Sequence, residues 1–170
     1  MTPLPGALGG SALVAWRLDD ALYASTWASG EGSYRVGGRW NSAGVRAVYA
    51  AIDPATAILE VAVHKGFHTL DTVPFVLTAI TILDTARVHV VDLTSVPNPN
   101  WLRSGSPSAG QQGYGDRLLA EHGFILVPSV VSVHSWNVVF VAGGVQGCYS
   151  FQQESFGLDT RLHPPTGRRI

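Results

Sequence analysis

Short apolar segments rich in β-branched residues outnumber the helical segments of this chain, and the two kinds do not alternate regularly. Segments of this composition are typical of β-strands. We expect strands at residues 12–18, 47–52, 75–83, 87–93, 124–133, 137–142 and 148–151. The sequence therefore predicts an α+β fold with a mixed or antiparallel sheet and few helices, rather than a doubly wound parallel sheet.

Two segments carry the signals of a helix. Asp53 can cap a helix whose first residue is Pro54, and this helix should end just before Gly66. A second, shorter helix is expected at residues 116–122, where Gly123 would end it. The first helix is the more informative one, because it carries a candidate site residue.

Two connections are long and rich in turn-forming residues. Residues 28–44 hold enough glycine to predict a loop or a very irregular hairpin without a regular helix, and residues 95–115 are predicted to be a second long connection. Neither requires a domain boundary. At 170 residues the chain has the length of one domain. We expect a single domain spanning 1–170, with flexible ends at 1–11 and 163–170.

The composition excludes several classes of protein. Hydrophobic residues make up 46% of the chain and charged residues 14%, which is not the composition of a disordered protein. The net charge of −1 lacks the basic excess of an autonomous nucleic-acid-binding protein. Cys148 is the single cysteine, so the chain has no internal disulfide. The sequence shows no signal peptide and no membrane-spanning run, and we expect a cytoplasmic location.

Glu60 lies in the first predicted helix, in a segment where apolar residues would cover nearly every face. A carboxylate in such surroundings is costly unless it is paired or functional. One explanation is a structural ion pair with an arginine. The other is a ligand site that presents hydroxyl groups or positive charge to the carboxylate, and the sequence leaves both open.

Arg39 lies among glycines in the segment 37–41, Gly-Gly-Arg-Trp-Asn. Glycines let the main chain approach a ligand closely, and a guanidinium can grip phosphate oxygens with two hydrogen bonds. A pyrophosphate would suit this loop. The alternative is a structural arginine that stacks on Trp40 or pairs with an acid.

Common nucleotide and metal motifs are missing. The glycines of residues 30–37 lack the spacing of a dinucleotide fingerprint, and no P-loop is present. His64 and His68 have the spacing of a metal pair, but Gly66 lies between them and no acidic residue completes the motif. We therefore expect no metal.

Several motifs from both halves of the chain belong together: Trp16-Arg17-Leu18, the glycine-rich loop with Gly-Gly-Arg-Trp-Asn, Val48-Tyr49-Ala50, the helical Leu59-Glu60-Val61, Val127-Pro128-Ser129 with Asn137, and the segment 156–162. Together they resemble the RES domain family, which supplies the toxin of bacterial Xre–RES toxin–antitoxin pairs. The resemblance departs at residues 141–147, which stand where many relatives have an Asn-Pro-x-His-Pro element.

The resemblance implies a core similar to that of the ADP-ribosyltransferases and a site that consumes NAD⁺. Residues are assigned to that site only where they match the family motifs. Catalytic roles fall on Glu60, Arg39 and Ser129, and contacts with NAD⁺ on Arg17, Arg39, Tyr49, Glu60, Ser129 and Asn137. Ser132 and Ser135 are rivals of Ser129 for the family serine.

The implied activity is cleavage of the nicotinamide–ribose bond of NAD⁺ by phosphate or water, which would deplete cellular NAD⁺. A carboxylate suits this chemistry, because the ribose develops oxocarbenium character as neutral nicotinamide leaves. Mono-ADP-ribosyl transfer to a protein and nucleotide binding without turnover are the alternatives. NAD⁺ is expected as substrate, inorganic phosphate as a candidate co-substrate, and no permanently bound cofactor. The family also implies an Xre-type helix-turn-helix antitoxin as partner and allows a homodimer.

Overall fold

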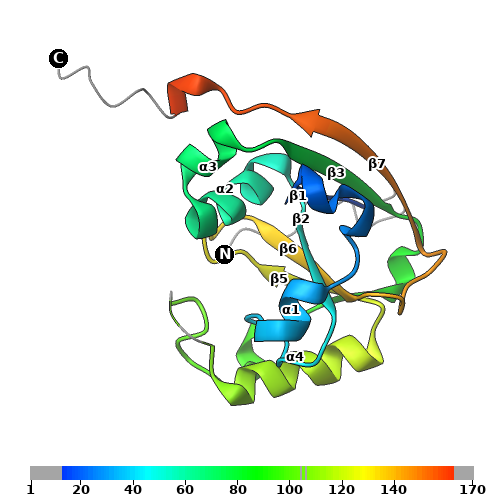
Figure 1. Ribbon diagram of the computed structural model, residues 1–170. Coiled ribbons are helices and arrows are strands. Elements are labelled where there is room, and N and C mark those ends of the chain that lie inside the picture. The colour runs from blue at the N-terminus through cyan, green and yellow to red at the C-terminus, as the bar shows by residue number, and fades with distance from the viewer. Residues whose placement is uncertain (1–12, 104, 106, 163–170) are drawn as a thin grey trace.

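The computed structural model describes residues 13–103, 105 and 107–162, and these form one seven-stranded sheet with helices packed against it (Figure 1). The strands are β1 (Leu13–Asp20), β2 (Ala47–Ala51), β3 (Phe75–Ile82), β4 (Val88–Val90), β5 (Phe124–Pro128), β6 (Trp136–Val141) and β7 (Tyr149–Phe156). The α-helices are α1 (Glu31–Val36), α2 (Pro54–Lys65), α3 (Phe67–Thr72) and α4 (Ala109–Glu121).

The sheet has the strand order β4-β5-β6-β2-β1-β3-β7. Only β4 and β5 pair in parallel, and the other neighbours are antiparallel. The predicted α+β fold with a mixed sheet is therefore confirmed. Within the described residues, the pairing of β1 with β2 is limited to Trp16 opposite Ala51, whereas β1 and β3 pair along their whole length. The sheet thus begins to separate between β1 and β2.

One face of the sheet carries α2, α3 and α4. Trp16 and Leu18 of β1 pack in one apolar cluster with α2 and α3, and Tyr49 and Val139 pack in another with α4. The cross-strand pairs show that these clusters share a face, because Trp16 lies opposite Ala51, two residues from Tyr49. Figure 1 shows α2 and α3 over one part of the sheet and α1 and α4 over the other.

The other face encloses the main core. Trp27 packs there against Phe140 of β6 and Phe151 of β7, with ring centroids 6.5 and 5.2 Å away. Three strands separate β6 from β7 in the sheet order, so the sheet must curl around Trp27 to bring both rings to it.

Helix α2 confirms the expected ends. The side chain of Asp53 accepts a hydrogen bond from the main-chain N–H of Thr56, Pro54 is the first helical residue, and Gly66 ends the helix with φ 79°. In the described part of the chain, no helix combines the length and apolar character that crossing a bilayer requires.

The prediction of no helix within residues 28–44 is wrong, because α1 lies there. Glycines with positive φ, Gly30 at 62° and Gly37 at 73°, bound this short helix. Glu31 stabilises it through an ion pair with Arg35 one turn later and a second with Arg46. Two of the glycines that suggested an irregular loop therefore mark the ends of a helix.

Helix α4 begins seven residues before the expected start at residue 116. Ser108 caps it by accepting a hydrogen bond from Gln111 N–H, and its glycines had suggested a connection. The other boundary errors are smaller: β4 and β5 are shorter than expected and β7 is longer. The flexible ends expected at residues 1–11 and 163–170 lie outside the described residues.

Gly115 has a specific packing role in α4. A Cβ atom at this position would lie 2.1 Å from the main-chain oxygen of Trp40. Gly115→Ala should therefore lower the free energy of unfolding by about 2 kcal/mol, because neither main chain can move away without disturbing its neighbours. The melting temperature should fall by roughly 4–8 °C. Gly113→Ala is the matched control, since a Cβ atom there meets nothing within 4 Å, and an equal loss of stability in both variants would refute this role.

Candidate functional site

Glu60 on α2 contacts residues from two other parts of the chain. Its Oε1 accepts a hydrogen bond from Ser129 Oγ at 2.9 Å and another from Asn137 Nδ2 at 2.7 Å. The described residues offer no hydrogen bond to Oε2 and no ion pair to the carboxylate. Among the described residues, no arginine forms the structural ion pair with Glu60 that was considered from the sequence. One oxygen fixes the carboxylate, and the other can accept a hydrogen bond from a ligand.

The three candidate serines have different environments. Only Ser129 places its hydroxyl on Glu60, and the main-chain N–H of Ser132 donates to Ser129 Oγ at 3.1 Å. The hydroxyl of Ser135 donates instead to Asp53, beside the start of α2. Ser129 is fully buried just after the end of β5. Among these three, Ser129 is the one brought to the helix glutamate.

Arg39 lies in the loop between α1 and β2, near enough to Glu60 for the two charges to interact. Its Nη1 donates to the main-chain oxygens of Trp101, at 2.7 Å, and Arg103, at 3.3 Å. Nε and Nη2 donate to no described residue, and Arg39 neither stacks on Trp40 nor pairs with an acid. Burial lowers the pKa of Arg39, while the nearby carboxylate of Glu60 acts in the opposite direction. The guanidinium stays charged and keeps two donor groups available.

Tyr49, on β2, supports the Arg39 loop, which is the segment of residues 37–46 between α1 and β2. Its hydroxyl donates to Asn41 Oδ1 at 2.7 Å and accepts from the main-chain N–H of Trp40 at 3.0 Å. Burial raises the pKa of Tyr49 well above its usual value, so the phenol remains protonated. Its side chain thus reaches the candidate site, with its hydroxyl engaged by the loop.

Arg17 lies at the separation between β1 and β2. Its Nη1 donates to the main-chain oxygen of Tyr49 at 2.8 Å, and its Nη2 pairs with Asp19 at 2.6 Å. Strand alternation places Arg17 on the face opposite Trp16. No hydrogen bond or ion pair in the described residues joins Arg17 to Glu60. Its Nε and the Oδ2 of Asp19 are buried without a partner among these residues.

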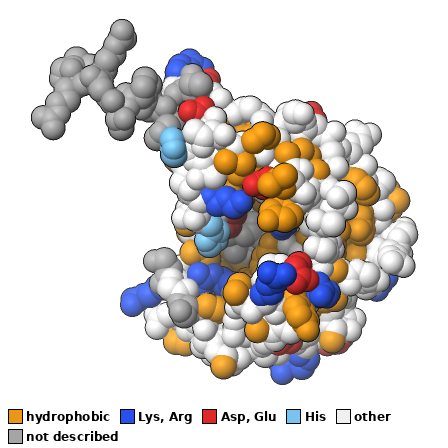
Figure 2. Space-filling model, in the orientation of Figure 1, with side chains coloured by type: hydrophobic (Ala, Val, Ile, Leu, Met, Phe, Trp, Pro, Cys, Tyr) orange, Lys and Arg blue, Asp and Glu red, His pale blue; other side chains and the backbone are white. Residues whose placement is uncertain are grey.

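Figure 2 shows this face of the molecule hollowed between the part with α2 and α3 and the part with α1 and α4. Basic side chains border the opening. Glu60 lies on α2, Arg39 in the loop after α1 and Asn137 on β6, so three separate parts of the chain contribute the candidate residues.

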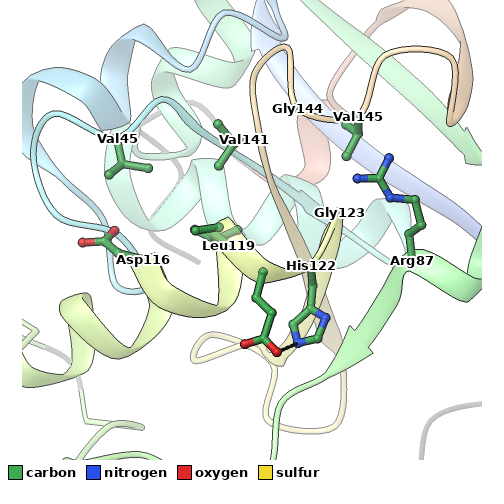
Figure 3. Close-up of a pocket in the computed structure, with 11 residues that line it drawn as sticks. Val45, Arg87, Asp116, Leu119, His122, Gly123, Val141, Gly144 and Val145 are labelled. Carbon is green, nitrogen blue, oxygen red and sulfur yellow. Dashed lines mark ion pairs between the residues drawn. The ribbon is translucent and has the colours of Figure 1, made fainter.

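A second concavity lies elsewhere (Figure 3). Its volume is about 330 Å³, and it contains none of the candidate site residues. Its lining includes Asp116 and Leu119 of α4, His122 just after that helix, Val141 at the end of β6 and Val145 beyond it. The divergent residues 141–147 thus contribute to this second pocket at the far end of β6, and Asn137 near the start of that strand lies beside Glu60.

The described residues contain no group of three or more His, Cys, Asp or Glu side chains placed to hold a metal ion. His64 ends α2 and His68 lies in α3, with Gly66 between the two helices. The two histidines therefore do not lie on successive turns of one helix.

The sequence reasoning missed the residues that hold the Arg39 loop. Gln112 Nε2 donates to the main-chain oxygen of Gly38 at 2.9 Å, and Asp116 accepts from Ser42 N–H at 3.0 Å. Both side chains come from α4, whose first two turns were expected to be a connection. The signal available in the sequence was Ser108, a good helix cap three residues before Gln111.

Comparison with known proteins shows the family of the chain. Residues 14–159 match the family model of the RES domain. The chain is also 33% identical over 155 residues to the protein named Toxin Res of Pseudomonas putida, strain KT2440, an alignment that covers 88% of this chain and 99% of that protein. The chain belongs to the RES domain family.

Proposed function

We propose that this chain is a toxin that cleaves the nicotinamide–ribose bond of NAD⁺. The observation that carries the proposal is the state of Glu60, whose Oε1 is held by Ser129 and Asn137 while Oε2 is left to a ligand. Membership of the RES family and the similarity to Toxin Res support the toxin role. The assignment of NAD⁺ rests on the family resemblance together with this geometry.

The reaction needs a positioned negative charge more than it needs a proton donor. As the bond between ribose C1′ and the nicotinamide nitrogen breaks, its electron pair leaves with neutral nicotinamide and C1′ gains positive charge. Glu60 would accept a hydrogen bond from a ribose hydroxyl through Oε2 and stabilise that charge. Because hydrogen bonds from Ser129 and Asn137 already orient the carboxylate, it does not have to be oriented during the reaction.

Arg39 supplies the complementary charge. Two of its nitrogens are free of described partners, which matches the two donors that a pyrophosphate can engage. The main-chain oxygens of Trp101 and Arg103 fix the third nitrogen. Arg39 would therefore hold the ADP part of NAD⁺ while Glu60 acts on the ribose.

The second reactant attacks C1′ after or as nicotinamide departs. Water would give ADP-ribose and release one proton, whereas inorganic phosphate would give ADP-ribose 1″-phosphate. A protein nucleophile would instead become ADP-ribosylated. All three share the cleavage step, and the residues described here serve each of them alike.

Incubation of the purified protein with NAD⁺ separates these outcomes. The products should be analysed without additions, with inorganic phosphate, and with cell extract. Nicotinamide with free ADP-ribose indicates hydrolysis, a phosphate-dependent product indicates phosphorolysis, and labelled protein indicates transfer. Bound but intact NAD⁺ in every condition would instead indicate a binding module and overturn the proposed reaction.

Growth in cells tests the toxin role separately. Production of the chain alone should stop growth and lower cellular NAD⁺, and production together with a helix-turn-helix antitoxin should restore both. The folded Glu60→Gln variant is the control. Undiminished growth with a good yield of the wild-type chain would contradict the toxin assignment.

Ser129→Ala should lower kcat for nicotinamide release by about tenfold, because one of two hydrogen bonds that orient Glu60 is lost. KM for NAD⁺ should change little. Ser132→Ala is the matched control, since Ser132 contacts Ser129 through its main-chain N–H, which the substitution keeps. Equal kinetic losses in both variants would show that the hydroxyl of Ser129 has no special part.

A further inference from the structure

The hydroxyl of Tyr49 lies against the residues on both sides of Arg39. It accepts a hydrogen bond from Trp40 N–H at 3.0 Å on one side. On the other side, a Cβ atom at Gly38 would lie only 2.6 Å from the phenol oxygen. One oxygen atom therefore fixes the main chain immediately before and after Arg39.

The phenol is itself anchored through Asn41. Asn41 is completely buried, and its Oδ1 accepts the Tyr49 hydroxyl at 2.7 Å. Its Nδ2 donates to the main-chain oxygens of Ser42 at 2.9 Å and Val45 at 3.2 Å. The loop thus folds around Asn41, and the hydroxyl of Tyr49 joins this folded loop to β2.

Helix α4 holds the same loop from its other side. The side chain of Gln112 donates to the main-chain oxygen of Gly38, and Asp116 accepts from Ser42 N–H. Gln112 therefore holds the main-chain carbonyl just before Arg39, and Tyr49 holds the main-chain N–H just after it.

We propose that the hydroxyl of Tyr49 is a positioning group, which holds Arg39 opposite Glu60 and does not itself bind the substrate. This inference rests on the proposed function, because it assigns Arg39 to the pyrophosphate of NAD⁺. The phenol donates its single proton to Asn41 and accepts from Trp40, so its hydrogen-bonding capacity is spent within the protein. The partly exposed ring remains free to pack beside a ligand.

Tyr49→Phe tests the role of the hydroxyl alone, because the ring is kept. KM for NAD⁺ should rise about tenfold, the change that corresponds to about 1.4 kcal/mol, and kcat should stay within about twofold. Tyr34→Phe is the matched control on the neighbouring α1, where the ring is exposed and its face lies against Arg46. This control should leave both kinetic constants unchanged.

A double-mutant cycle distinguishes positioning from direct binding. In an Arg39→Ala background, Tyr49→Phe should raise KM no further, because the hydroxyl acts through Arg39. If the hydroxyl bound NAD⁺ directly, the two increases would multiply. Multiplied effects, or a fall in kcat with unchanged KM, would overturn the proposal.

Hydrogen exchange provides a readout that does not depend on activity. The amide proton of Trp40 is bonded to the Tyr49 oxygen, so Tyr49→Phe should accelerate its exchange at least tenfold, with the amide of Val139 in the sheet unchanged. Unchanged exchange at Trp40 would overturn the positioning role. A wild-type chain that releases no nicotinamide would instead refute the proposed function, and the exchange result would still decide the role of Tyr49 in the loop.

Discussion

Glu60→Gln is expected to lower kcat for nicotinamide release by about 10²-fold or more, with KM for NAD⁺ changed by less than about threefold. The substitution keeps the shape and removes the charge that would stabilise the ribose in the transition state. The side-chain oxygen of glutamine can still accept from Ser129 and Asn137, so the orientation of the side chain should persist. Steady-state kinetics on both proteins measures the effect.

The stability of the same variant separates a catalytic role from a structural one. Glu60 forms no ion pair with the described residues, so the melting temperature should fall by less than about 4 °C. A carboxylate that neutralised a buried arginine would cost roughly 3–5 kcal/mol on replacement. Glu121→Gln, an exposed carboxylate on α4, is the control and should retain full turnover. Normal turnover or a large loss of stability in Glu60→Gln would contradict the catalytic assignment.

Arg39→Ala is expected to raise KM for NAD⁺ by roughly 10- to 100-fold with a much smaller change in kcat. A pyrophosphate contact acts in the bound substrate and in the transition state alike, so its loss weakens binding without slowing the bound complex. Titration of NAD⁺ against initial rate measures both constants. Arg39→Lys should recover part of the affinity, because lysine restores the positive charge but cannot form the two parallel hydrogen bonds of a guanidinium.

A neighbouring arginine provides the control for charge. Arg103 is exposed, and only its main-chain oxygen contacts Arg39. Arg103→Ala should therefore keep KM within about twofold, since its charge lies in solvent. An equal rise of KM in the two alanine variants would mean that general positive charge, rather than a fixed Arg39, attracts the substrate.

Local signals in the sequence predicted the parts of the fold that depend on neighbouring residues. Asp53, Pro54 and Gly66 predicted the ends of α2 because capping is a local interaction. The start of α4 was missed although Ser108 is a good cap, because the glycines in its first two turns resemble a connection. One of these glycines, Gly115, is required by its close approach to the main chain of Trp40. A contact between residues so distant in the chain leaves no local sequence pattern.

The candidate site was likewise predicted only in part from the sequence. The family motifs brought Glu60, Ser129 and Asn137 to attention, and the structure joins all three through hydrogen bonds. No motif showed that a single carboxylate oxygen takes both bonds and leaves the other available. Likewise, Arg39 could be singled out in its loop, but its partners Trp101 and Arg103 lie more than 60 positions away.

Nicotinamide release tests most directly the claim that Glu60 promotes cleavage of the nicotinamide–ribose bond of NAD⁺. Purified wild-type protein and the folded Glu60→Gln variant should be incubated side by side with NAD⁺, and nicotinamide and remaining NAD⁺ should be quantified over time. We predict that the wild type releases one nicotinamide for each NAD⁺ lost, and that the variant does so about 10²-fold more slowly or worse. Intact NAD⁺ after incubation with folded wild-type protein, or equal release by both proteins, would contradict the claim.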